Sequence, residues 1–342
     1  MRWKNRPEGS NWGDFGPDDQ IGRLNWLGPE QVKKGIAEVT EGRTFCLSLP
    51  LDLPGGNALH PARHPPQRYA THSDGRDRFL MPLRDAMNDP ELTDVVNDDR
   101  VMLTMKYSTQ WDALSHVSGL FDADGDGEAE LVFYNGWRGG EHITAEPCDE
   151  CGGMTGTYAR ELGVNSIAER CVQGRAVMID LHRAFGDAHV DVDFSGLSEA
   201  MSTQNVSVEK GDLVMLHTGW TGKIVEMGGN PTHDVLHRSC TALEGRDPAL
   251  QEWIRDSGLV ALIADNYAVE RAPSRTGSGQ RAMLPIHELC LFKLGIPLAE
   301  IWWLGDLARY FAETGRNRCL LTAPPLRLPG AVGSPVTPVA TV

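Results

Sequence analysis

The sequence predicts an α/β protein, and three observations indicate that class. Short apolar runs typical of buried strands occur at 176–180, 213–216 and 259–264. Segments with helical spacing of apolar residues follow some of these runs, as at 247–258 and 285–294. No internal repeat or Pro/Ser-rich linker divides the 342 residues, so one domain with an N-terminal extension is favoured over two domains. Strands that alternate with helices are typical of the α/β class.

The N-terminal segment is predicted to contain one helix. Apolar residues recur at helical spacing from Pro29, a suitable first helical residue, to Gly42, which ends the pattern. Alternating apolar residues then predict a strand at 45–51. We expect residues 1–42 to form an extension, either a dimer arm or a substrate cap, ahead of the main domain at 43–342.

A long polar region follows that strand. Residues 53–99 are rich in Pro, Asp, Arg and His, as in a binding loop or an oligomer arm. Residues 101–112 alternate between two unlike faces and predict one continuous strand. One face is apolar, and the other includes Lys106, Gln110 and Asp112. This second face suits the wall of a cleft better than a core.

The remaining predicted elements have clear start and stop signals. Asp247 and Pro248 begin a helix that Gly258 ends. Pro285 begins another helix, which ends at Gly295, and a strand-like run follows at 301–304.

Composition excludes several classes of function. Lys and Arg number 32 against 47 Asp and Glu, a net charge of −15, which disfavours binding to nucleic acid or to an anionic membrane. No apolar run approaches the ~18 residues that a membrane span requires. The N-terminus has no apolar core of the secretory type. We expect a cytoplasmic protein with a small-molecule substrate.

The cysteines support a reducing location. Seven cysteines, an odd number spread along the chain, do not suit a disulfide framework. Cys148 and Cys151 form one CxxC pair, which we interpret as reduced thiols in a loop, with a metal knuckle as the alternative.

Two motifs imitate metal sites. Asp122, Asp124 and Asp126 begin like a calcium loop, but the twelfth position is Phe133, so we predict an acidic surface turn, with a weak calcium site as the alternative. His233 and His237 have the spacing of a zinc helix, but the nearby Asn230-Pro231 indicates a loop.

Four other residues could together bind a divalent cation. Asp112 and His116 lie in STQWDALSH, His287 stands near a helix start, and Glu300 precedes a predicted strand. Asp, His and Glu can hold a cation and leave positions open for water, as hydrolysis requires. Incidental placement on separate elements is the alternative.

The chain also resembles a known family along most of its length. Stretches in matching order include NWGDFGPDDQIGRLNWL, QWDALSH, GRAVMIDL, GDLVMLHTGW, LIADNYAVE, PIHELCLFKLGIPLAE and APPLRLPGAVGSPVTPVA. They are similar to the cyclase family of hydrolases, which includes bacterial kynurenine formamidase and isatin hydrolase. The resemblance implies a swivelling β/β/α domain, assembly as homodimers or homotetramers, and zinc- or manganese-dependent hydrolysis of small amides, cyclic amides or lactones.

The family signature HxGTHxDxPxH can be aligned on Asp112 and His116. Two signature histidines that serve the first metal of two-metal members then fall on Lys106 and Gln110, and the Pro position is Leu114. The resemblance gives the second metal to Asp112 together with His287 and Glu300. It gives His116 the role of proton donor and acceptor.

This departure predicts at most one metal. A protonated Lys106 repels a cation, and the neutral amide of Gln110 is a weaker ligand than imidazole. We expect one zinc or manganese ion held by Asp112, His287 and Glu300, with Gln110 as an optional fourth ligand and no organic cofactor. The alternative is a metal-free site in which Lys106, Gln110 and His116 perform the chemistry.

The predicted reaction is water attack on a small cyclic amide, imide or lactone, or on an aryl formamide. His116 acts as general base and acid, while Gln110 and Lys106 stabilise the developing negative charge. The predicted substrate-binding residues are Trp12, or alternatively Trp26, with Trp111, His217 and Tyr267; packing is the alternative for the last two. A lyase or cyclase, and a non-catalytic small-molecule-binding homologue, are the competing functions.

Overall fold

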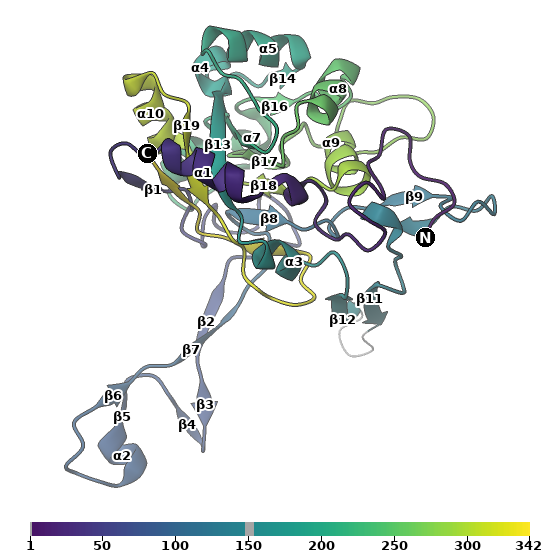
Figure 1. The fold of residues 1–342 in the computed structure, drawn as a ribbon. Coiled ribbons are helices and arrows are strands. Elements are labelled where there is room, and N and C mark those ends of the chain that lie inside the picture. The colour runs from purple at the N-terminus through teal and green to yellow at the C-terminus, as the bar shows by residue number, and fades with distance from the viewer. Residues whose placement is uncertain (1, 148–153) are drawn as a thin grey trace.

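A nine-stranded mixed sheet forms the centre of the computed structural model, which describes residues 2–147 and 154–342 (Figure 1). In sheet order the strands are β1 (Thr44–Cys46), β21 (Val339–Thr341), β19 (Arg318–Thr322), β13 (Gln173–Asp180), β15 (Leu213–His217), β17 (Ala261–Ala264), β18 (Leu298–Glu300), β8 (Gln110–Asp112) and β20 (Gly333–Pro335). The four strands from β13 to β18 are parallel, and the flanking strands pair antiparallel.

The parallel strands are buried on both faces, which explains their continuous apolar runs. Successive residues alternate between two cores, because side chains along a strand point to opposite faces. In β13, for example, Val177 and Ile179 join one core, while Ala176 and Met178 join the other.

Helices cover both faces of the sheet (Figure 1). The first core includes residues of α4 (Leu181–Phe185), α5 (Phe194–Thr203), α8 (Pro248–Asp256), α9 (Pro285–His287) and the π-helical η3 (Glu288–Leu294). The second core includes residues of η1 (Gly22–Trp26), α3 (Val164–Glu169) and α10 (Gly305–Thr314), and α1 (Pro29–Ala37) lies beside β13 and β19. The predicted α/β class is therefore confirmed, as are the predicted helices that start at Pro29, Pro248 and Pro285.

Shorter elements complete the fold. They are two-stranded pairs β9 (Gly119–Phe121) with β10 (Glu130–Val132), β11 (Ile143–Pro147) with β12 (Met154–Ala159), and β14 (Asp191–Val192) with β16 (Ala242–Leu243), together with η2 (Tyr134–Gly136), α6 (Trp220–Met227) and α7 (His233–Arg238).

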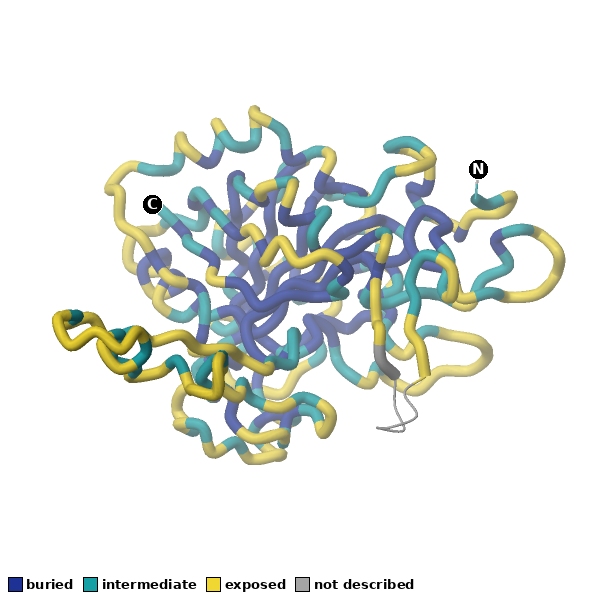
Figure 2. Tube along the Cα trace, turned by 90° about the horizontal axis from the view of Figure 1, so that it is seen from below, coloured by how far each residue is buried: buried dark blue, intermediate teal, exposed yellow. Residues whose placement is uncertain are grey.

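An arm at residues 67–102 projects from this body (Figure 1). It contains β2 (Gln67–Ala70), β3 (His72–Ser73), β4 (Arg76–Asp77), β5 (Met81–Pro82), α2 (Leu83–Met87), β6 (Val95–Val96) and β7 (Asp99–Met102). Not one residue of the arm is buried (Figure 2). Nevertheless several of its apolar side chains are large, including Leu80, Met87 and Met102, which are 71%, 67% and 61% exposed.

The predicted continuous strand at 101–112 is wrong. β7 ends at Met102 on the arm, the chain turns at 103–109, and β8 begins at Gln110. β8 pairs with three residues of β18 on one side and three residues of β20 on the other. The alternating pattern therefore belongs to two different strands.

Two other predicted elements also need correction. The strand expected at 301–304 lies at 298–300, since Ile301 has a φ of +60° and leaves the extended conformation. The loop expected around His233 is the helix α7, which begins just after Pro231, a residue that tolerates the start of a helix.

The N-terminal segment packs against the body. Leu24 is fully buried in the second core, and the Trp12 indole nitrogen donates to the carbonyl of Phe292 at 2.8 Å. The expected boundary at residue 42 stays a prediction. Cys148 and Cys151 lie outside the described residues, while the five described cysteines are free thiols: Cys46, Cys171, Cys240, Cys290 and Cys319. Among the described helices none has the length and apolar character to cross a membrane.

Candidate active site

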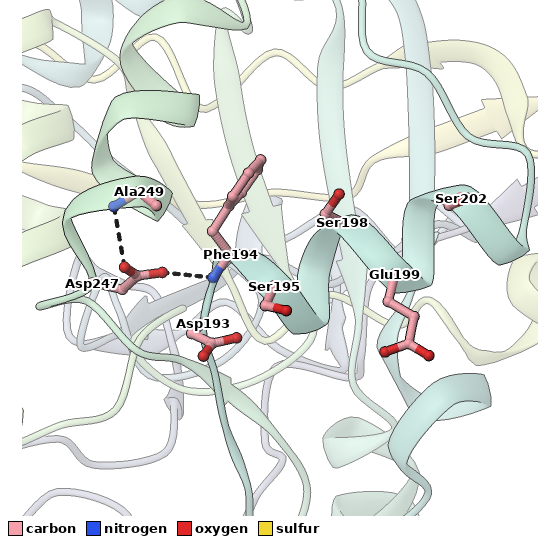
Figure 3. A pocket seen from close by; sticks show the side chains of 8 residues that line it. All are labelled: Asp193, Phe194, Ser195, Ser198, Glu199, Ser202, Asp247 and Ala249. Atoms are coloured by element: carbon pink, nitrogen blue, oxygen red, sulfur yellow. Dashed lines mark hydrogen bonds between the residues drawn. The ribbon is translucent and has the colours of Figure 1, made fainter.

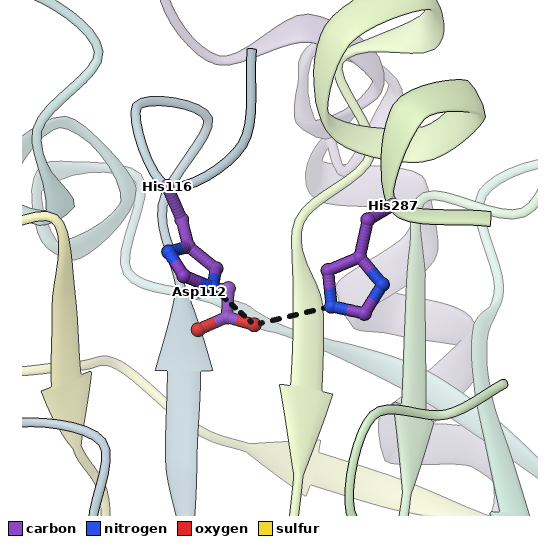
Figure 4. Close-up of side chains that lie close together, drawn as sticks. All are labelled: Asp112, His116 and His287. Atoms are coloured by element: carbon purple, nitrogen blue, oxygen red, sulfur yellow. Dashed lines mark ion pairs between the residues drawn. The ribbon is translucent and has the colours of Figure 1, made fainter. Parts of the chain in front are cut away.

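Three neighbouring elements bring the predicted metal ligands together, and Figure 4 shows two of them, Asp112 and His287, with His116. β8 carries Gln110 and Asp112, and His116 lies in the turn that follows it. Glu300 of β18 pairs in register with Gln110, and His287 ends α9. All these residues except His116 are buried, and Asp112 has no exposed surface.

Asp112 lies between the two imidazoles. Its Oδ2 is 4.0 Å from Nε2 of His116 and 3.9 Å from Nε2 of His287. Ligand atoms of these three residues all lie within 4.8 Å of one another. Nε2 of His287 is also 3.3 Å from Oε1 of Glu300.

The unpaired oxygens of this centre fit a divalent cation. Both carboxylate oxygens of Asp112 and Oε1 of Gln110 are buried without a hydrogen-bond partner among the described residues. Burying a carboxylate without partners is strongly unfavourable. A cation coordinated by Asp112 and imidazole would relieve that penalty, because carboxylate and imidazole are common metal ligands.

The observed group of possible ligands is Asp112, His116 and His287. It differs in one residue from the predicted ligand set, in which Glu300 takes the place of His116. Glu300 instead accepts a hydrogen bond from Nε2 of Gln110 at 2.9 Å, which leaves the Gln110 oxygen free. The ligand role of Glu300 and the proton-transfer role of His116 therefore stay predictions.

Glu270 holds His287 in place, and the sequence analysis missed it. One carboxylate oxygen of Glu270 lies 2.9 Å from both the backbone nitrogen and Nδ1 of His287. This contact directs Nε2 of His287 toward Asp112, as outer-shell carboxylates do for metal-binding histidines. Burial lowers the pKa of His287, but hydrogen bonds with Glu270 and Glu300 outweigh burial and raise the pKa to about 10.

Lys106 also reaches this centre. Its Nζ lies 2.7 Å from Nε2 of His116, contacts Nδ1 as well, and is 3.7 Å from Oδ1 of Asp112. Burial lowers the pKa of Lys106, and Asp112 opposes that shift. Burial likewise lowers the pKa of His116, to about 3, because the opposing effect of Asp112 is smaller. His116 is therefore a neutral imidazole at neutral pH.

Gly333 makes room for Lys106, and no sequence signal pointed to it. This residue of β20 pairs with Asp112 across the sheet. A Cβ atom at Gly333 would lie 2.7 Å from Cδ of Lys106 and 3.0 Å from the carbonyl oxygen of Trp111. Real Cβ atoms avoid such distances, so the missing side chain permits the observed position of Lys106.

The four predicted substrate-binding residues have different environments. Trp111 and Trp12 are 0% and 1% exposed, and the contacts described for them are those of core residues. His217 ends β15 and bonds through Nδ1 to Asp180 at 2.8 Å. Tyr267 lies near enough to Asp112 that this carboxylate raises the pKa of the phenol, although burial is the larger cause. All four substrate-binding roles stay predictions.

A surface hollow shown in Figure 3 is lined by none of the residues of this centre. It measures about 620 Å³ and is lined by Asp193, Phe194, Ser195, Ser198, Glu199, Ser202, Asp247 and Ala249. Asp247 accepts from the backbone nitrogens of Phe194 at 2.6 Å and Ala249 at 3.1 Å. Its carboxylate therefore caps the first turns of α5 and α8.

The acidic sequence at 122–127 forms a turn. Oδ1 of Asp122 accepts from the backbone nitrogens of Gly125 and Asp126, at 2.6 and 3.1 Å. Asp122, Asp124 and Asp126 lie close enough to share a cation, but part of their acceptor capacity is used by the turn itself.

The fold and the centre define an α/β protein with an Asp–His–His group, built around a fully buried Asp112, that suits a divalent cation. A family model described as "Putative cyclase" matches residues 47–271. The chain therefore belongs to the cyclase family, as its motifs indicated.

Solved structures agree with this assignment. A crystal structure of a novel cyclase is similar at 29% identity and a TM-score of 0.73, covering 97% of both chains. Isatin hydrolase A from Labrenzia aggregata, bound to benzyl benzoate, is 12% identical with a TM-score of 0.54, covering 87% of this chain and 93% of that one. An isatin hydrolase bound to the product analogue thioisatinate is 14% identical with a TM-score of 0.52, covering 92% and 99%. A search of curated proteins returned no match.

Proposed function

We propose that the protein is a hydrolase of a small cyclic amide, imide or lactone, or of an aryl formamide. One observation carries the proposal: a fully buried Asp112, whose two carboxylate oxygens have no hydrogen-bond partner among the described residues, lies 4.0 Å from the imidazole of His116. The similarity in fold to isatin hydrolases supports the same reaction class.

In the proposed reaction His116 takes a proton from the attacking water and returns it to the leaving nitrogen or oxygen. A neutral imidazole can accept that proton directly. Lys106 donates to the carbonyl oxygen as negative charge develops there, which favours the transition state over the bound substrate. Gln110, fixed through its amide nitrogen by Glu300, offers its oxygen to a cation or to an incoming water.

At most one zinc or manganese ion is proposed. Asp112 and His287 would hold it, with His116 or Glu300 as the third ligand. Such an ion supplies Lewis acidity toward a carbonyl and increases the acidity of water. The ammonium of Lys106, 3.7 Å from Asp112, disfavours a second cation in the same space.

A metal-free hydrolase is the second candidate, and the position of Lys106 favours it. An ammonium beside both His116 and Asp112 supplies positive charge where a metal otherwise would. A lyase or cyclase using the same acid–base group, and a non-catalytic small-molecule-binding homologue, complete the alternatives.

Turnover of a panel of lactones, cyclic imides and aryl formamides, before and after chelation, tests the proposal. Loss of activity on chelation, restored by zinc or manganese, supports the one-metal hydrolase. Activity that survives chelation but disappears in His116→Ala supports the metal-free enzyme. Absence of turnover across the panel would contradict the hydrolase and favour the binding homologue.

We also propose that a second copy of the chain covers the arm. A two-stranded ribbon without a core is marginally stable in water, yet this arm exposes Leu80, Met87 and Met102. Closed homo-oligomers are the commonest assemblies of soluble proteins, and the predicted homodimer or homotetramer would bury these side chains. The free thiols support the proposed reducing, cytoplasmic location.

A further inference from the structure

A second basic residue, Arg63, contacts Lys106 of the candidate active site. It lies in the loop between β1 and the arm and is half-buried. One terminal nitrogen of Arg63 donates to the backbone carbonyl of Lys106 at 2.8 Å. Its guanidinium also lies over the ring of Tyr267, with 5.5 Å between the central carbon and the ring centroid.

These two contacts fix the guanidinium between separate parts of the chain. Lys106 belongs to the turn before β8, whereas Tyr267 follows β17. A guanidinium fixed in this way loses little further freedom when it binds a ligand. Its position is therefore preorganised.

Arg63 lies next to the proposed catalytic group. It contacts the backbone of Lys106, whose Nζ lies 3.7 Å from Oδ1 of Asp112. Two basic residues thus lie together on a chain of net charge −15.

Arg63 nevertheless has no ion-pair partner within 4.0 Å in residues 2–147 and 154–342, and within those residues its side chain makes one hydrogen bond, through a single nitrogen. Many other arginines of the chain pair with a carboxylate, as Arg175 does with Asp212 at 2.8 Å. A planar guanidinium with free donors matches the two oxygens of a carboxylate. The free donors of Arg63 are therefore available to an anion from outside the chain.

We propose that Arg63 binds a carboxylate, either one that the substrate already carries or the one that hydrolysis releases. The inference rests on the proposed hydrolase function, because opening an amide or lactone with water yields one acid and one amine or alcohol. Arg63 would hold that group beside Lys106.

Binding measured without turnover tests this subsite separately from the enzyme activity. Benzoate and benzamide serve as matched anionic and neutral probes for calorimetric titration of the full chain. We expect wild-type protein to bind benzoate about 10- to 100-fold more tightly than Arg63→Gln, with benzamide unaffected. Arg63→Lys keeps the charge but lacks the planar guanidinium with its paired donors, so its affinity for benzoate should lie between those of wild type and Arg63→Gln.

Arg68→Gln is the matched control. Arg68 lies on β2, is exposed, and should leave benzoate binding unchanged. Equal benzoate affinity in wild type, Arg63→Gln and Arg63→Lys would overturn the proposal. So would a wild type that shows no saturation by about 10 mM benzoate. Neither result depends on whether the protein hydrolyses anything.

Two cyclic imides then distinguish the source of the carboxylate. For a phthalimide carrying a ring carboxylate, Arg63→Gln should raise KM about 10- to 100-fold if the group belongs to the substrate, while unsubstituted phthalimide is unaffected. If Arg63 binds the released acid, KM stays constant and inhibition by the ring-opened product weakens for both compounds. An Arg63→Gln enzyme that shows no change in KM and no change in product inhibition would contradict both sources of the carboxylate.

Discussion

Nζ of Lys106 lies 2.7 Å from Nε2 of His116 and 3.7 Å from Oδ1 of Asp112. The proposed base and the proposed metal ligand thus share one ammonium group. Because this ammonium occupies space beside Asp112, it competes with a cation for the same oxygens. The position of Lys106 therefore affects both catalysis and metal affinity.

Replacing Lys106 by methionine should separate these two effects. Lys106→Met keeps the length of the side chain but removes the charge, so we expect kcat to fall about 10²-fold. Manganese affinity should rise in the same variant, because the repulsion is gone. Lys33→Met, at an exposed position of α1, is the control. Unchanged manganese affinity in calorimetry would contradict a shared site.

Asp112→Asn tests the metal through stability. A ligand that binds only the folded state raises the free energy of unfolding, by about 2.7 kcal/mol at a concentration of 100 Kd, and therefore raises the melting temperature. We expect zinc or manganese to raise the Tm of the wild type and not of Asp112→Asn. Without metal the variant should be less stable than the wild type, because asparagine leaves the buried ammonium of Lys106 without its counter-charge. Equal increases in Tm in both proteins would indicate that the metal binds at a site that does not include Asp112.

His116→Ala should lower kcat about 10²- to 10⁴-fold if His116 transfers the proton. Metal content, measured by elemental analysis, distinguishes this role from ligation. A base that does not bind metal can be removed without loss of the ion, whereas removal of a ligand reduces occupancy. Loss of metal together with activity would assign His116 to the ligand group of Asp112 and His287.

The sequence predicted the central sheet and its helices because their signals are local. The apolar runs of β13, β15 and β17, and the Pro residues that begin α1 and α8, each act within a few residues. The same local reasoning failed at 101–112, where one alternating pattern spans the end of the arm and a core strand. No local signal marks where the arm strand β7 ends and the core strand β8 begins.

The sequence predicted only part of the candidate site, because local signals reveal residue types but not contacts between distant residues. Asp112, His116, His287 and Glu300 were found as metal-type or acid–base residues, and the fold brings them together. Arg63, Glu270 and Gly333 were missed because each acts through a partner distant in sequence. An arginine in a polar loop and a glycine near the C-terminus carry no sign of those partners.

The Asp180–His217 pair predicts a pH-dependent stability. Burial lowers the pKa of His217, but the bond to Asp180 outweighs it and raises the pKa above about 6.5. The pKa of Asp180 is lowered, since His217 outweighs the raising effect of burial. The pair therefore stabilises the fold most between about pH 4 and 6.5. This contribution declines as the pH rises through the folded pKa of His217 or falls through that of Asp180.

Asp180→Asn should measure this contribution, because asparagine can still cap α4. In denaturant titrations we expect a loss of about 1.5–3 kcal/mol near pH 5.5 that shrinks toward pH 9. Asp187→Asn is the matched control: Asp187 bonds His182 at 2.9 Å, but its side chain is 54% exposed, so we expect a smaller loss of under about 1 kcal/mol. A loss in Asp180→Asn that is equal at pH 5.5 and pH 9 would refute the ionic contribution.

Removal of the arm tests the proposed assembly. Gln67 and Met102 are paired in register, so an Asn-Gly turn can join β2 and β7 near their base. We expect the shortened chain to remain folded but to lose its oligomeric state in analytical ultracentrifugation. Circular dichroism would check the fold. A shortened chain with the same sedimentation as the full chain would contradict the role of the arm.

The space beside Lys106 has a consequence for the ancestry of this site. Because Gly333 leaves room for the lysine, a lineage that acquires Lys106 in this position is favoured by glycine at the β20 position. A relative with a smaller residue at position 106 loses one of the two close contacts and keeps the one with the Trp111 carbonyl. Paired inheritance of these two distant positions would thus mark the branch of the family in which an ammonium entered the candidate site.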